Sequence, residues 1–221
     1  MTDLVRRGIY ALPAAGVLTA VPWFFILGKS SVKTDPEGYA RGVTSTGNAV
    51  GGYIYLAGFI CLLFGLLALY GYLARTRAAS WAAAGMIVSV VGIGLALPVF
   101  GIFGLADQVL GDVYLAGHKD VSAAMLKLAG GTLSDRINNY LGILILVSLI
   151  GAIAYAVAVW KSGSLPKWAG VLVAPGFMLS MSFSPYVAWV GALCLFIGGL
   201  WLAIRVSQAP SAGVTAPSMQ A

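Results

Sequence analysis

Long apolar runs separated by short polar stretches make up most of this chain. A run of about 20 apolar residues can cross the hydrocarbon core of a bilayer as an α-helix, in which every backbone group finds its hydrogen bond. The pattern predicts six such helices, at about residues 9–27, 50–73, 81–103, 139–160, 168–183 and 186–206. The expected fold is an all-α polytopic membrane bundle over 1–206. A disordered tail, rich in small polar residues and proline, is expected over 207–221.

Two of the predicted helices depart from the ideal pattern. The first contains Pro13 and Pro22, and is expected to stay as a span because its apolar stretch is longer than that of a signal peptide and no small-residue cleavage pattern follows it. The fifth rises only about 24 Å against a core of roughly 30 Å, and Pro175-Gly176 is expected to interrupt it. A locally thinned bilayer and a half-span that leans on its neighbours both fit this length.

Composition supports lipid as the natural solvent of this chain. Of its 221 residues, 60% are hydrophobic and 9% are charged, whereas about a quarter are charged in soluble proteins. The net charge of +6 does not indicate a nucleic-acid partner, because no basic cluster is longer than Arg6-Arg7. The basic excess has a better explanation in the orientation of the chain in the membrane.

Lysine and arginine are distributed unequally between the two sides that the six helices define. One side has short connections and seven basic residues, with Asp3 as its one acid: Arg6, Arg7, Arg75, Arg77, Lys161, Lys167 and Arg205. The other side has long connections in which six acids balance six basic residues. The positive-inside rule therefore predicts that both termini lie in the cytoplasm. The expected location is the inner (plasma) membrane. Trp81, Trp160 and Trp168 stand beside the basic residues, as expected of an interfacial aromatic belt.

The stretch "LADQVLGDVYLAGHKD", residues 105–120, is the one place where candidate chemistry gathers. It holds three of the seven acids and the single histidine, which gives the candidate site residues Asp107, Asp112, His118 and Asp120. Metal ligands on a helix stand three or four residues apart, and these stand five, six and two apart, so no pair shares a helical face. We therefore interpret the stretch as the start of an external loop of about 30 residues, not as a catalytic or metal site. Within that loop, Asp120 is expected to cap an amphipathic helix over 121–129, and Thr132 and Asp135 to form a capping box for the fourth span.

Apart from Arg205 at the end of the sixth, the predicted spans contain no Asp, Glu, Lys, Arg or His, which are the usual markers of proton relays and ion paths in a membrane. No cofactor is expected, since a single histidine cannot supply two axial ligands to haem and no span carries a lysine for retinal. Cys61 and Cys194 lie in apolar runs and are expected to be small buried thiols. Small residues four apart are expected to let helices pack closely: Gly16/Ala20, Gly92/Ala96, Gly170/Ala174 and Gly199/Ala203.

The run "SGSLPKWAGVL", residues 162–172, together with the six-helix layout, resembles small prokaryotic integral membrane proteins of unknown function. The resemblance implies only a membrane protein and assigns no catalytic residue. From the residues we expect a non-enzymatic protein that binds a lipid or other lipophile, or an accessory subunit of a membrane complex. Membrane lipids are the expected partners, and a protein partner or homo-oligomer is left open. The alternative is a small membrane enzyme or transporter with a site on the outer face near Asp107 and His118.

Overall fold

The computed structural model describes residues 3–26, 33–124, 134–182 and 185–208, and this part of the chain is helical with short turns. The described residues contain no β-strand. The elements in chain order are α1 (Asp3–Gly8), α2 (Ala11–Ala20), α3 (Pro22–Ile26), α4 (Pro36–Val43), α5 (Thr46–Leu73), α6 (Ala79–Leu115), the 3-10 turn η1 (Lys119–Val121), α8 (Ser134–Ser162), α9 (Lys167–Ser180) and α10 (Pro185–Gln208). The residues of the expected tail that follow Gln208 lie outside the described part of the chain.

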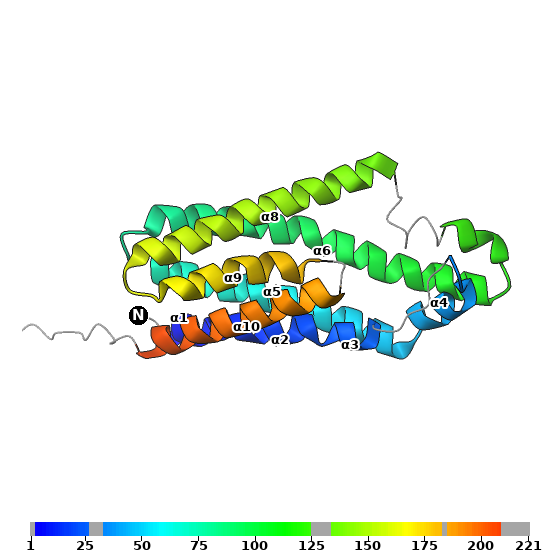
Figure 1. The fold of residues 1–221 in the computed structure, drawn as a ribbon, viewed down its shortest axis with the longest axis horizontal. Helices are drawn as coiled ribbons and strands as arrows, with labels where there is room; N and C mark the ends of the chain where they lie inside the picture. Colours follow the sequence, from blue (N-terminus) through cyan, green and yellow to red (C-terminus); the bar gives the residue numbers. More distant parts are fainter. Residues whose placement is uncertain (1–2, 27–32, 125–133, 183–184, 209–221) are drawn as a thin grey trace, which may run out of the picture.

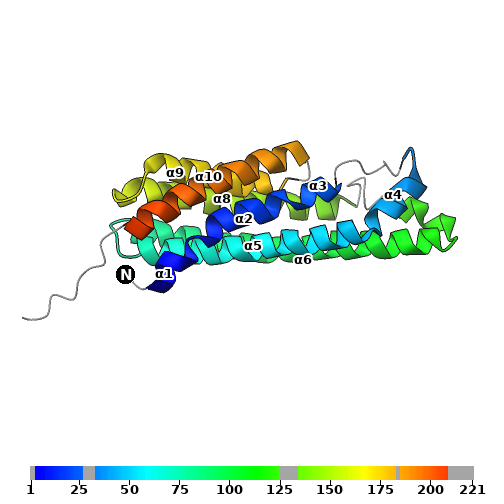
Figure 2. The ribbon, with the colours of Figure 1, turned by 90° about the horizontal axis from the view of Figure 1, so that it is seen from below.

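Six of these helices pack in a closed ring. In the order α2, α5, α6, α8, α9 and α10, each helix contacts the next, and α10 returns to α2. Helix α1, the end of α10, the α5–α6 turn and the α8–α9 turn all lie at one end of the bundle (Figure 1). At the other end, α6 extends past the hairpin of α9 and α10 toward α4 (Figure 2). Every connection in the ring therefore joins neighbours, as in an up-and-down bundle.

Five helical stretches within the described residues are long and apolar enough to cross a membrane. They are Asp3–Phe24, Thr46–Leu73, Ala79–Pro98, Gly142–Ser162 and Tyr186–Gln208. Helix α9 has 14 residues and rises about 21 Å, which is shorter than the core of a bilayer. It nevertheless lies in the ring, packed between α8 and α10.

The first predicted span corresponds to the apolar stretch Asp3–Phe24, which is divided into three helices. The chain turns at Ile9 and Tyr10 and again at Val21, so that α1, α2 and α3 follow one another as separate helices. Proline explains both boundaries, because it lacks a backbone N–H and its ring clashes with the carbonyl four residues earlier. Pro13 falls in the first turn of α2, where that N–H has no helical partner, and Pro22 begins α3.

The prediction that the third helix ends at about residue 103 is wrong. Helix α6 continues through Pro98 to Leu115, so residues 105–115 are helical and the connection to α8 is shorter than expected. Likewise α9 runs through Pro175 without interruption. A proline inside a helix removes one backbone hydrogen bond, and packing against neighbouring helices can support the rest of the ladder.

Glycines allow close helix contacts at the predicted small-residue positions, which confirms their packing role. A Cβ on Gly16 of α2 would lie 2.7 Å from the backbone nitrogen of Phe196 on α10, and one on Gly199 of α10 would lie 2.9 Å from Pro13 N. Gly170 faces the Val159 side chain in the same way, with its added Cβ 2.8 Å from Val159 Cβ. These helices can approach each other so closely because glycine has no side chain.

Helices α6 and α8 interlock through two serine–glycine pairs. Ser89 of α6 sits against Gly151 of α8, where an added Cβ would lie 2.6 Å from Ser89 Oγ. Ser148 of α8 sits against Gly92 of α6, with a corresponding distance of 2.8 Å to Ser148 Oγ. Each helix thus carries the pattern Ser-x-x-Gly, and the serine of one fills the space left by the glycine of the other.

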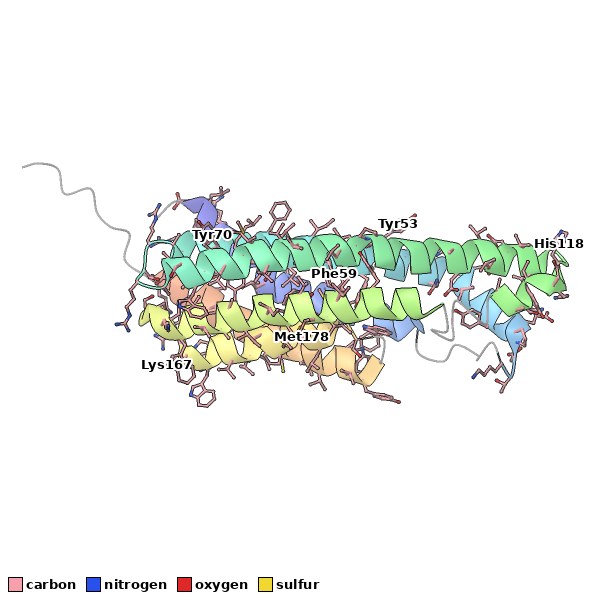
Figure 3. All side chains as sticks on the ribbon, turned by 90° about the horizontal axis from the view of Figure 1, so that it is seen from above. Tyr53, Phe59, Tyr70, His118, Lys167 and Met178 are labelled. Carbon is pink, nitrogen blue, oxygen red and sulfur yellow. The ribbon has the colours of Figure 1, made fainter. Side chains whose placement is uncertain are left out.

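Two tyrosines link helices across the interior of the ring. Tyr55 on α5 donates a hydrogen bond of 2.6 Å to the carbonyl oxygen of Ser180 at the end of α9, and Tyr155 on α8 donates one of 2.9 Å to Leu66 O on α5. Phe59 and Phe177 belong to the same core and are fully buried. Figure 3 shows Phe59 midway along the bundle. Both tyrosine hydroxyls are therefore hydrogen-bonded where they reach a neighbouring helix.

Candidate functional site

The C-terminal end of α6 carries a small docked helix that the sequence pattern did not predict. Asp35 precedes α4 and its side chain accepts a hydrogen bond of 2.8 Å from Gly38 N, while Pro36 begins the helix. Glu37 and Arg41, four residues apart, form an ion pair of 2.6 Å. The signal was present in "DPEGYAR", since an Asp cap, a proline at the first position and an i,i+4 charge pair are start signals of a helix.

Asp107 lies where α4 meets α6. Tyr39 of α4 donates a hydrogen bond of 2.7 Å to Asp107 Oδ2, and both side chains are half-buried. Burial and the adjacent Asp107 carboxylate raise the pKa of Tyr39 far above its usual range, so Tyr39 keeps its proton and remains a donor. A second small core supports the contact, because Ala40 packs with Tyr114 of α6. Gly111 permits the approach, since a Cβ there would lie 2.8 Å from Val43 Cγ2.

The other three candidate residues lie on the surface and beyond Asp107. Asp112 is exposed on α6, His118 is exposed in the turn that follows it, and Asp120 is exposed within η1. Within the residues that the structure describes, no group of three His, Cys, Asp or Glu side chains is placed to hold a metal ion. Asp120 lies inside the 3-10 turn instead of capping a helix, and the rest of the expected amphipathic helix and Thr132 lie outside the described residues. The four residues are therefore not gathered into one site.

A basic pocket opens at the opposite end of the molecule, where Figure 3 shows Lys167 far from His118. We use this name for the cavity of about 600 Å³ lined by Arg77, Trp160, Lys161, Gly163 and Lys167. These residues come from the α5–α6 turn, the last turns of α8, the α8–α9 turn and the first position of α9. Two turns that are more than 80 residues apart in sequence thus form one site.

Specific contacts position the three cations of the basic pocket. Arg77 Nε donates a hydrogen bond of 2.7 Å to the carbonyl oxygen of Lys161, which ties the two turns together. Lys161 Nζ lies 4.7 Å from the ring centroid of Trp81, and Lys167 Nζ lies 5.2 Å from that of Trp160. Cation–π contacts of this kind hold a cation beside a ring without neutralising it. The pocket therefore keeps its positive charge.

Gly163 shapes the basic pocket through its backbone. Its φ of +71° is a left-handed conformation that favours glycine, and it ends α8. A Cβ there would lie 3.3 Å from Arg77 Nη2, so the missing side chain leaves room for the guanidinium group. The ion pair of Arg41 with Glu37 lies at the other end of the molecule. Within the described residues, the three cations of the basic pocket have no carboxylate partner.

An apolar groove adjoins the basic pocket and shares two of its residues. We use this name for the cavity of about 190 Å³ between α8 and α9 that is lined by Ala156, Val157, Trp160, Lys161 and Val171. Every atom exposed in it is apolar, so Lys161 contributes its methylene stem. Ala156 and Val171 lie four to five residues inward from Lys161 and Lys167, which is about 6–8 Å along the helices. The groove thus leads from the charged end toward the middle of the bundle.

Sequence reasoning found these cations but not the site that they form. In the sequence, the charges of Arg77, Lys161 and Lys167 served only to predict the orientation of the chain. Trp81 and Trp160 were assigned to an interfacial aromatic belt. Which turn meets which depends on the ring order of the helices, and no spacing in the sequence shows that. Both cysteines are free and partly buried among the described residues, so they contribute no disulfide to either site.

Comparisons with protein-family models, curated proteins and solved structures found no match for this chain.

Proposed function

We propose that this protein is a multi-pass protein of the inner (plasma) membrane, with six helical segments in the bilayer and both termini in the cytoplasm. The charge distribution supports this, because the end that carries α1 and the two short turns holds the basic residues with a single acid, Asp3. Helix α9 counts as a sixth segment because it occupies a place in the ring beside α8 and α10, although it is short.

The role proposed within this frame is non-enzymatic binding of a lipid or other lipophile. The observation that carries it is the apolar groove between α8 and α9, which leads inward from a charged end. Its rim is formed by Trp160 and Val171, which are 47% and 36% exposed and so offer apolar surface to a ligand. An apolar cavity with a few polar groups at one end is the usual form of a lipophile site. If a protein covers this surface instead, the role becomes that of an accessory subunit.

The competing function, an enzyme or transporter with a site near Asp107 and His118, has less geometric support. Tyr39 holds Asp107 in a buried contact between two helices, and His118 is exposed beyond the end of α6. The pair Tyr39–Asp107 is explained by the docking of α4.

Native mass spectrometry of the protein released from mild detergent tests the proposed function. We expect a stoichiometric lipid mass on the wild-type chain, and loss of that mass in Ala156→Trp, which fills the groove. Ile153→Trp is the matched control, because Ile153 lies on the same helix, is half exposed and does not line the groove. A clean apo monomer would contradict lipophile binding, and a defined complex with another protein would support the accessory-subunit role instead.

A further inference from the structure

The basic pocket and the apolar groove share Trp160 and Lys161, and together they have the polarity of a single amphiphile. One end offers three cations and the other only hydrocarbon. A ligand that satisfies both must carry a compact negative group attached to an apolar chain. Resting on the lipophile binding proposed above, we infer that the natural occupant is an anionic phospholipid, whose phosphate lies in the basic pocket and whose acyl chain enters the groove.

The three cations are arranged to bind a phosphate group, beyond attracting negative charge in general. Arg77 uses its Nε–H on the Lys161 carbonyl, which leaves its terminal N–H groups beside Gly163 for a ligand. A guanidinium group held in one orientation matches the oxygens of a phosphate through paired hydrogen bonds. Lys161 and Lys167 flank it, each fixed over an indole ring. A diffuse basic surface would not hold its cations in place in this way.

The start of α9 adds to the same field. Lys167 is the first residue of this 14-residue helix, and Pro166 at its cap makes no side-chain capping bond. The positive end of the helix dipole therefore faces the basic pocket. Basic pockets between helices at the cytoplasmic face of a membrane are suited to anionic headgroups, whereas a zwitterionic headgroup gains less because its own cation is repelled. The chemistry thus favours phosphatidylglycerol or a similar lipid over phosphatidylcholine.

A lipid-preference measurement on the full chain tests this inference. The protein is reconstituted in nanodiscs that contain equal amounts of phosphatidylglycerol and phosphatidylcholine with the same acyl chains, then released and weighed with its retained lipid. The wild type should retain phosphatidylglycerol preferentially. Each substitution among Arg77→Gln, Lys161→Gln and Lys167→Gln should lower that preference about fivefold, and the triple variant should retain both lipids alike. Arg75→Gln is the matched control, because Arg75 is exposed in the same turn, carries the same charge and does not line the pocket.

The outcomes separate the two proposals. If no lipid is retained by the wild type, lipophile binding itself fails. If lipid is retained without a preference for phosphatidylglycerol, or if Arg75→Gln lowers the preference as much as Lys161→Gln does, the anionic site is overturned while lipid binding stands. Inorganic phosphate is added to the protein in phosphatidylcholine nanodiscs, to distinguish a site for a lipid headgroup from a site for a free phosphate ion. Tight phosphate binding without a chain would overturn the lipid assignment.

Discussion

Ser89 and Ser148 are polar residues at the contact between α6 and α8, and they act there through their size. Both side chains are buried, and neither hydroxyl has a hydrogen-bond partner among the described residues. A buried hydroxyl without a partner does not stabilise a fold, so the value of these serines is their size. Each occupies the space above a glycine of the facing helix, and the interface depends on the sum of the two volumes.

Substitutions at this contact should show the dependence on volume directly. Gly92→Ala should destabilise the protein by about 1–3 kcal/mol, because the new Cβ would lie 2.8 Å from Ser148 Oγ. Ser148→Ala alone should be nearly neutral. The double variant should recover most of the loss, since the nearest remaining atom, Ser148 Cα, is 3.4 Å away. Unfolding in a denaturing detergent, followed by circular dichroism, measures all three.

Gly191→Ala provides a comparison for the three variants at Gly92 and Ser148. Its added Cβ would meet the backbone nitrogen of Ser180 on α9, so no side-chain truncation can make room for it. We expect a loss of stability that no partner substitution restores. A double variant of Gly92 and Ser148 no more stable than Gly92→Ala alone would contradict the packing account.

At the scale of elements, the long apolar runs predicted the ring helices but not their ends. The apolar runs locate α5, α8 and α10 because burial in lipid or in the bundle requires them. The pattern failed at Pro175, where local helix propensity argues for a break and packing against neighbouring helices overrides it, and beyond residue 103, where α6 continues to Leu115. It also failed at α4, whose stability comes from docking on α6, a contact between residues about 70 positions apart.

The docking of α4 should depend on pH through Tyr39. The pKa of Tyr39 is raised while α4 is docked, whereas an undocked tyrosine releases its proton near pH 10. The docked state is therefore fully favoured below about pH 10 and loses stability as the pH rises further. A spin label at Arg41, exposed on α4, should become more mobile above this pH. In Tyr39→Phe, which removes about 1 kcal/mol of hydrogen bonding, it should be more mobile at neutral pH and show little further change.

Asp107→Asn serves as the control for the spin-label experiment. It keeps a hydrogen-bond acceptor for Tyr39 but removes the carboxylate charge that helps to raise the pKa of Tyr39. The loss of docking at high pH should therefore be smaller than in the wild type. Identical pH profiles in the wild type and Tyr39→Phe would show that another group controls the docking of α4.

At the scale of the whole molecule, the ring has two chemically different ends. One end holds the basic pocket, the short turns and α1, and the other holds the acidic residues of α6 and the docked helix α4. Between them, the five apolar helical stretches carry Asp, Glu, Lys or Arg only near the basic end. In the orientation proposed above, the basic end faces the negatively charged cytoplasmic leaflet. The lipid site proposed above depends on that orientation, since the basic pocket must face the cytoplasmic headgroups.

Cysteine accessibility in intact cells tests this orientation most directly. Single cysteines are introduced at His118, Ser164 and Tyr186 in a chain whose Cys61 and Cys194 are replaced by Ala, and each is exposed to a membrane-impermeant maleimide. We expect His118→Cys and Tyr186→Cys to react in intact cells, and Ser164→Cys, in the α8–α9 turn, only after permeabilisation. An unreactive Tyr186→Cys alone would mean that α9 does not cross fully. Reaction of Ser164→Cys in intact cells, or of His118→Cys only after permeabilisation, would contradict the account.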